Sequence, residues 1–199
     1  LKKPDAVLGL ATGSTPVPVY RALIEMGRQG LIDFSRVRTF NLDEYVGLSP
    51  DHPQSYRRFM NEQLFDHINI NKANTRVPSG VAADLRAEAA AYDRAIEAAG
   101  GIDLQLLGLG GDGHWAFNEP GSSLGSRTRV IALTAQTLDD NYEAFCKHAG
   151  MQRCDMPHFA ITMGIGTILE AKNILMLVSG AKKAQIAAKA LEGPITAQV

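Results

Sequence analysis

Short apolar runs alternate along this chain with longer stretches in which apolar residues recur every three or four positions. The apolar runs predict strands over residues 6–10, 37–42, 103–108, 128–133, 159–163 and 174–179, and the run at 103–108 is typical of a buried strand. The periodic stretches predict amphipathic helices that begin near residue 17 and cover about 56–64, 85–99 and 181–191. Gly100 and Gly101 are typical of the end of the third helix.

Strands that alternate with helices of this length indicate βαβ units, whose strands run parallel. The predicted fold class is therefore α/β: a Rossmann-like three-layer sandwich with a mostly parallel sheet covered on both faces. We expect one domain over residues 1–199, trimmed at both ends relative to a complete chain.

Composition narrows the class of protein. The 199 residues are 45% hydrophobic and 21% charged with a net charge of -1, as in a globular domain with a sizeable core. The scattered charges argue against a nucleic-acid partner. The apolar runs are too short to span a membrane. Cys146 and Cys154 are expected to be free thiols, so the sequence predicts a cytoplasmic protein.

The glycine-rich stretch at residues 108–120 carries candidate chemistry directly after an apolar strand. It contains Asp112, His114 and Glu119. One carboxylate can orient an imidazole while another relays a proton, which suits proton transfer near neutral pH. Ordinary turn chemistry around a packed histidine is the alternative. No His-x-x-x-His or Cys-x-x-Cys pattern is present, so no metal site is predicted.

Two other strand ends carry polar residues. Thr12, Gly13, Ser14 and Thr15 lead into a helix with Pro16 expected at its first position, which favours an anion such as phosphate at the helix N-terminus. A plain cap by Ser14 or Thr15 is the alternative.

Asp43 and Glu44 follow the second strand. Because adjacent side chains in an extended segment point to opposite sides, only one should face the cleft, and we choose Asp43. A solvated turn is the alternative interpretation.

With these turns in view, the chain resembles the glucosamine-6-phosphate deaminase family, which is related to 6-phosphogluconolactonase. The matching segments are residues 8–16, 40–47, 55–56, 112–120, 126–129 and 180–184. The specific part is the sequence Asn-Glu-Pro at 118–120, because the lactonase branch lacks a glutamate there.

The resemblance implies a cofactor-free enzyme that converts glucosamine 6-phosphate and water to fructose 6-phosphate and ammonia. Asp43 would move the proton from C2 to C1, and His114 would open the sugar ring with Asp112 and Glu119 orienting it. The loop at residues 12–15 and Lys183 would hold the phosphate. The partner is then a small phosphorylated amino sugar, and the relatives are often monomers or hexamers, which allows a homo-oligomer.

Several positions depart from the family pattern. Glu143 stands where a phosphate-binding arginine is expected in the lid. Either Arg153 or another group of the lid compensates, or the register of residues 146–156 against the family pattern differs, or the preferred substrate differs. Trp115 replaces a smaller residue, which keeps galactosamine 6-phosphate open as substrate. Arg129 matches a residue of an allosteric site in hexameric relatives, but Ile131 replaces its lysine.

Two other functions remain open. A 6-phosphogluconolactonase would not need the Asp43 carboxylate for carbon-proton transfer. A non-catalytic phosphosugar-binding module would not need Asp43, His114 and Glu119 together.

Overall fold

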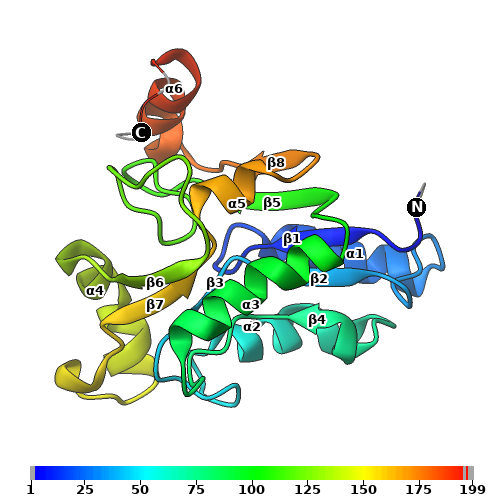
Figure 1. Ribbon diagram of the computed structural model, residues 1–199, viewed down its shortest axis with the longest axis horizontal. Helices are drawn as coiled ribbons and strands as arrows, with labels where there is room; N and C mark the ends of the chain where they lie inside the picture. The colour runs from blue at the N-terminus through cyan, green and yellow to red at the C-terminus, as the bar shows by residue number, and fades with distance from the viewer. Residues whose placement is uncertain (1–2, 195, 197–199) are drawn as a thin grey trace.

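A parallel sheet forms the centre of the computed structural model, which describes residues 3–194 and 196 (Figure 1). Its five strands lie in the order β4-β2-β1-β5-β8 and every pair is parallel. The strands are β1 (Val7–Leu10), β2 (Arg38–Asn41), β4 (Thr75–Arg76), β5 (Leu104–Gly108) and β8 (Ile174–Leu177). This arrangement confirms the predicted α/β class.

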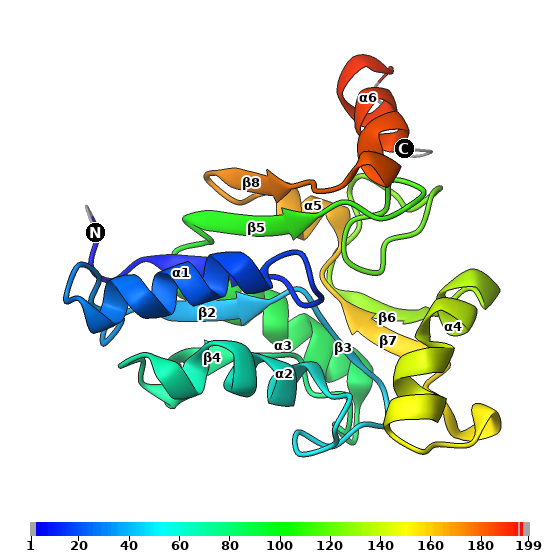
Figure 2. The same ribbon diagram turned by 180° about the vertical axis from the view of Figure 1, so that it is seen from behind.

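Helices cover both faces of this sheet. On one face, α3 (Leu85–Ala98) and α5 (Ile165–Leu169) pack against apolar side chains of β1, β2 and β5 (Figure 1). On the other, α1 (Val17–Arg28) and α2 (Tyr56–Gln63) form a second core cluster (Figure 2). The last helix, α6 (Ala184–Glu192), follows β8.

Local sequence signals explain where two of these helices begin and end. The Ser55 side chain accepts hydrogen bonds from the first turn of α2, and Asp84 does the same for α3. Gly100 and Gly101, with φ of 86° and 77°, adopt the left-handed conformation that ends α3. The predicted end of this helix is therefore confirmed.

A second, antiparallel sheet was not predicted. It consists of β3 (Asp43–Tyr45), β7 (Phe159–Thr162) and β6 (Arg129–Ala132), in the order β3-β7-β6. The runs at 128–133 and 159–163 are strands as expected, but they do not join the parallel sheet. The chain passes from β2 through Leu42 directly into β3, so the expected turn at Asp43 is a strand.

The segment after β6 forms a helical lid over this small sheet, from α4 (Ala135–Tyr142) through the π-helix η3 (Glu143–His148) to the 3-10 turn η4 (Arg153–Asp155). Phe145 and Met156 pack against Tyr45 and Ala160 beneath. Three further 3-10 turns are η1 (Phe65–His67), η2 (Lys72–Asn74) and η5 (Ala181–Lys183).

Two remaining expectations concern thiols and membranes. Cys146 and Cys154 are both free thiols, as predicted. Across the described ranges, 3–194 and 196, the helices are too short or too polar for any of them to cross a membrane.

Candidate functional site

The candidate residues follow strands that end at the same edge of the structure. Because β1, β2, β5 and β8 are parallel, their carboxyl ends lie at one edge of the sheet, where open α/β sheets bind ligands (Figure 1). The loop at 12–15 follows β1, the turn at 109–120 follows β5, and Lys183 comes after β8. Asp43 lies just beyond β2, in β3.

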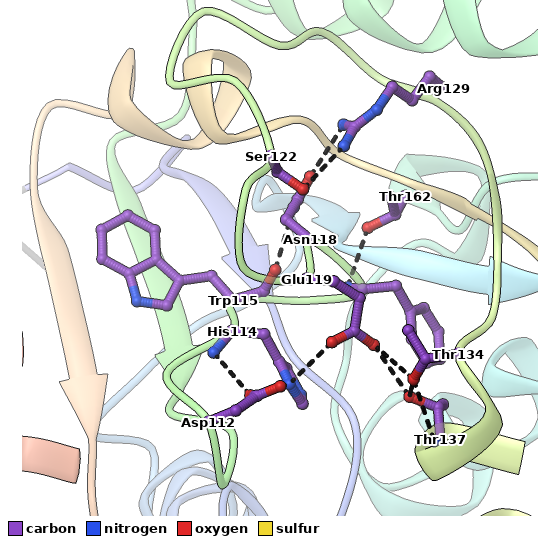
Figure 3. A network of polar contacts seen from close by, with 11 residues as sticks. Asp112, His114, Trp115, Asn118, Glu119, Ser122, Arg129, Thr134, Thr137 and Thr162 are labelled. Atoms are coloured by element: carbon purple, nitrogen blue, oxygen red, sulfur yellow. Dashed lines mark hydrogen bonds and ion pairs between the residues drawn. The ribbon is translucent and has the colours of Figure 1, made fainter. Parts of the chain in front are cut away.

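The turn after β5 places an imidazole between two carboxylates (Figure 3). His114 Nδ1 lies 2.6 Å from Asp112 Oδ1 and 3.9 Å from Glu119 Oε2. The same Asp112 oxygen accepts a hydrogen bond from the backbone N–H of His114 at 3.2 Å. Partial burial raises the pKa of Asp112, but the hydrogen bonds and charge of His114 outweigh it, so the pKa lies below its usual value. Asp112 is therefore a carboxylate that orients the ring.

Glycine is required on the inner side of this turn. A Cβ atom added at Gly110 would lie 2.5 Å from atoms of the His114 ring. Ala116 has a φ of 55° in the same turn, a conformation that non-glycine residues adopt at a cost of about 1–2 kcal/mol. Surrounding contacts must therefore hold the turn in place.

Glu119 connects the turn to the lid. Its Oε1 accepts hydrogen bonds from Thr137 Oγ1 at 2.9 Å and Thr134 Oγ1 at 3.3 Å (Figure 3). Thr134 is also the N-cap of α4, so the carboxylate lies at the positive end of that helix. These contacts hold the carboxylate through Oε1 and leave Oε2 facing His114.

Asp43 is buried, and within the described part of the chain, residues 3–194 and 196, it takes part in no ion pair. Its side chain is 6% exposed, and burial together with the Glu44 charge raises its pKa to about 8. A carboxyl group with such a pKa can exchange a proton at neutral pH, which general base catalysis requires.

Glu44 points the other way and stabilises the start of α2. Its carboxylate accepts hydrogen bonds from Ser55 Oγ at 2.7 Å and from the backbone N–H groups of Tyr56 and Arg57, both at 3.0 Å. Burial raises the pKa of Glu44, although these donors oppose the shift. All of its acceptor capacity serves the fold, which leaves Asp43 as the carboxyl group available for chemistry.

Strand β7 brings Asp43 and the imidazole turn to the same place. Asp43 is paired with Thr162 in the antiparallel ladder, so the two side chains share one face of the small sheet. Thr162 Oγ1 accepts a hydrogen bond from the backbone N–H of Phe117 at 3.3 Å. The Phe117 ring also packs 5.4 Å from Tyr45 and 6.2 Å from Tyr56, centroid to centroid. The turn therefore lies on the Asp43 side of β7.

The loop after β1 has free hydrogen-bonding groups at the start of α1. Gly13 has a φ of 92°, and Ser14 and Thr15 are exposed. The prediction places Pro16 at the first helical position, but Pro16 is the N-cap residue of α1, and no side chain caps the helix. The alternative that Ser14 or Thr15 is a plain cap is therefore wrong, and the helix N-terminus remains available to an anion.

Lys183 is half-buried between η5 and α6, next to the end of β8. Within residues 3–194 and 196 it forms no ion pair. β8 lies beside β5, and β5 lies beside β1, so Lys183 and the loop at 12–15 flank the imidazole turn along the same edge.

The lid does not supply the arginine that the family pattern expects. Glu143 has an exposed side chain and lies 3.9 Å from Lys147. Arg153 is paired with Asp139 and its guanidinium carbon lies 5.4 Å from the Tyr142 ring centroid. Arg153 is therefore bound to α4, and in this arrangement it does not replace the missing group.

A cavity of about 320 Å³ adjoins the other side of the imidazole turn. His114, Trp115 and Glu119 line it together with apolar residues of α5 and α6, such as Leu169 and Leu191. Neither Asp43 nor the loop at 12–15 contributes to this cavity. A site that uses all of the candidate residues therefore extends beyond this cavity.

The sequence did not indicate which residues hold the turn. Asn118 is 3% exposed and connects the turn to Met163, directly after β7, and Arg129 contacts Asn118. The donor atoms of Asp112, His114 and Glu119 lie within 4.8 Å of one another, which is close enough for a cation. Two of the carboxylate oxygens already accept protein hydrogen bonds, as expected for a proton relay.

Comparison with known proteins gives consistent matches. Residues 2–199 match the family model described as glucosamine-6-phosphate isomerases/6-phosphogluconolactonase. The glucosamine-6-phosphate deaminase of Cellvibrio japonicus is 57% identical over 98% of this chain and 73% of its own length. That of Thermoanaerobacter sp. strain X514 is 52% identical over 100% and 76%.

Solved structures also match this chain. A monomeric glucosamine-6-phosphate deaminase superimposes with a TM-score of 0.92 at 46% identity, covering 99% of this chain and 80% of that chain. The 6-phosphogluconolactonase of Thermotoga maritima superimposes with a TM-score of 0.74 at 23% identity, covering 97% and 78%, and so shares the fold.

Proposed function

Because this chain belongs to the family of glucosamine-6-phosphate isomerases and 6-phosphogluconolactonases, we propose that it is a glucosamine-6-phosphate deaminase. The substrate is then a phosphorylated amino sugar, and the products are fructose 6-phosphate and ammonia. One observation carries the proposal: a buried carboxyl group with a raised pKa, Asp43, accompanies a separate imidazole relay, His114 with Asp112 and Glu119. Ring opening and carbon-proton transfer each require their own proton carrier.

His114 carries out ring opening in this proposal. Since the Asp112 carboxylate only accepts, the neutral imidazole keeps its proton on Nδ1 and leaves Nε2 as the base. Nε2 takes the proton from the anomeric hydroxyl, and the imidazolium returns a proton to the ring oxygen as the C1–O5 bond breaks. Asp112 and Glu119 stabilise the positive charge between these two transfers.

Asp43 carries out isomerisation. Its carboxylate removes the proton from C2 of the open-chain aldehyde while the C2 ammonium group passes a proton to O1, and the Asp43 acid then returns its proton to C1, which leaves a hydroxyl at C1 and an iminium group at C2. Water adds to the iminium carbon and the C–N bond breaks, releasing ammonia and the ketone. The raised pKa of Asp43 suits both transfers. It makes the carboxylate a stronger base toward the C2 proton than an ordinary aspartate, and the protonated form can still donate its proton to C1.

The phosphate is assigned to the other groups at this edge. The free hydroxyls of Ser14 and Thr15, the N-terminus of α1 and the unpaired ammonium of Lys183 together favour a dianion. Tyr56, which shares a hydrogen bond with Thr12, links this loop to the aromatic cluster beside Asp43. Phosphate binding would thereby position C1 and C2.

The test is an ammonia-release assay with the purified protein and a panel of 6-phosphorylated sugars. We expect turnover of glucosamine 6-phosphate, weaker turnover of galactosamine 6-phosphate, and no loss of rate after treatment with EDTA. A preference for the galactosamine compound would reassign the substrate. Hydrolysis of 6-phosphogluconolactone without ammonia release from any amino sugar would replace the deaminase with a lactonase. Binding of the panel without turnover would leave a phosphosugar-binding module.

Two further properties are proposed with this function. An enzyme of amino sugar metabolism without a membrane-spanning helix in the described ranges, 3–194 and 196, suits the cytoplasm. The solved deaminase at 46% identity is monomeric, so a monomer is proposed here over a homo-oligomer. Light scattering of the purified protein distinguishes the two states.

A further inference from the structure

Asn118 lies between the two halves of the candidate site, and all of its side-chain hydrogen-bonding groups have partners. Its Nδ2 donates to the carbonyl oxygen of Met163 at 2.7 Å. The same nitrogen donates to the Trp115 carbonyl oxygen at 3.0 Å, and Oδ1 accepts from Arg129 Nη1 at 2.8 Å (Figure 3). The side chain is 3% exposed. These contacts fix the orientation of the amide, because a guanidinium only donates and carbonyl oxygens only accept.

The contacts of Asn118 join the segments that carry His114 and Asp43. Its bond to Trp115, together with a backbone bond from its own N–H at 3.0 Å, closes the turn around Ala116, whose φ is 55°. Its bond to Met163 reaches the residue whose N–H donates to the Leu42 carbonyl at 2.7 Å. Leu42 immediately precedes Asp43. A short path of hydrogen bonds therefore connects the imidazole turn to the strand of the base.

We propose that Asn118 is a positioning residue that sets the placement of the His114 turn relative to Asp43, with Arg129 holding its amide in the required orientation. This role rests on the proposed function for its kinetic consequence. Its structural consequence stands independently, because the turn contains Trp115, the one tryptophan of the chain. Fluorescence of that indole reports the geometry of the turn whether or not the protein has turnover.

The decisive variant is Asn118→Asp, which keeps the shape and the Arg129 contact but replaces the donating Nδ2 with an acceptor that faces two carbonyl oxygens. We expect kcat for ammonia release to fall at least tenfold, while the dissociation constant of a non-reacting 6-phosphorylated sugar alcohol changes less than twofold. Quenching of Trp115 fluorescence by acrylamide should increase. Asn71→Asp introduces the same charge at an exposed N-cap of η2 and should change none of these quantities.

The outcomes separate this inference from the proposed function. An unchanged kcat with unchanged quenching overturns it, and so does a parallel loss of kcat and affinity, which would indicate general damage to the site. If the parent protein releases no ammonia, the deaminase proposal fails, and the quenching measurement alone decides whether Asn118 holds the turn. If Asn118→Asp does not fold, Asn118→Ala, which removes the donors without adding an acceptor, is judged by the same criteria.

Discussion

The imidazole of His114 approaches the carboxylate of Asp112 through Nδ1, at 2.6 Å from Oδ1, and not through Nε2. This contact defines which nitrogen carries the proton in the neutral ring. It also keeps Nε2 available, so a hydrogen bond between side chains two residues apart determines the direction of proton transfer.

Replacing Asp112 with asparagine should disturb this arrangement without changing its size. The amide can donate to Nδ1, which favours the tautomer with the proton on Nε2, so we expect kcat for ammonia release to fall about 10²–10³-fold. KM should change little because the phosphate-binding groups are untouched. Asp140→Asn, which changes an exposed acid of α4, is the matched control. Full activity of Asp112→Asn would show that the tautomer does not matter.

The activity should rise with pH through the titration of Asp43. Burial raises the pKa of Asp43 to about 8, so the carboxylate needed as base is scarce at pH 6 and abundant at pH 9. We expect kcat to increase up to tenfold per pH unit below this pKa and to level off above it. The ionisation of the substrate amine, followed separately by NMR, is the control. A kcat that does not vary between pH 6 and 9 is incompatible with this base.

The same buried carboxyl group should lower stability at neutral pH. In the unfolded chain Asp43 loses its proton near pH 4, whereas in the folded protein it keeps the proton to about pH 8, so stability from this group falls as pH rises between these values. Asp43→Asn removes the penalty, which is up to about 4 kcal/mol at pH 7. The melting temperature of the variant should exceed that of the parent at pH 7.5 and approach it at pH 4.5. A constant difference would contradict the assigned pKa.

Substitution of Glu44 should lower stability, in contrast to substitution of Asp43. Glu44→Gln places an amide donor among N–H and O–H donors at the start of α2, so we expect the free energy of unfolding to fall by about 2–4 kcal/mol. Glu62→Gln affects an exposed pair with Arg58 and should cost less than about 1 kcal/mol. Urea denaturation measures both. Equal losses would remove Glu44 from its capping role.

Lys183 should contribute to binding and not to chemistry. Lys183→Ala removes a cation from the phosphate region, so KM for glucosamine 6-phosphate should rise about tenfold, equivalent to about 1.4 kcal/mol, while kcat changes little. Lys182→Ala removes the exposed neighbouring lysine and serves as the control. If the two substitutions have the same effect on KM, Lys183 has no specific role in phosphate binding.

Much of the parallel sheet could be predicted because its strands are short apolar runs bounded by loops. Val7–Leu10 and Leu104–Gly108 are strands that lie within such runs, and Gly100 and Gly101 end a helix in the expected way. The position of Asp112, His114 and Glu119 in one turn could also be predicted, because nearness along the chain brings these residues together.

Other features depend on contacts between distant residues, which local patterns do not encode. β3 consists of Asp43, Glu44 and Tyr45, two of which are acidic, and it becomes a strand because β7 pairs with it from more than a hundred residues away. The different roles of Asp43 and Glu44 likewise depend on whether α2 supplies donors. The sequence pattern alone does not reveal that α2 supplies these donors to Glu44 and not to Asp43.

The hydrogen bonds from Thr134 and Thr137 to Glu119 give the lid influence over the catalytic turn. Displacing the first turn of α4 would take two hydrogen-bond donors from that carboxylate. An open lid would then leave the Glu119 carboxylate free to turn away from the imidazole, and in the proposed mechanism ring opening would slow until the lid closed again. Closure of the lid would in this way couple substrate binding to ring opening, and a site without fully bound substrate would remain inactive.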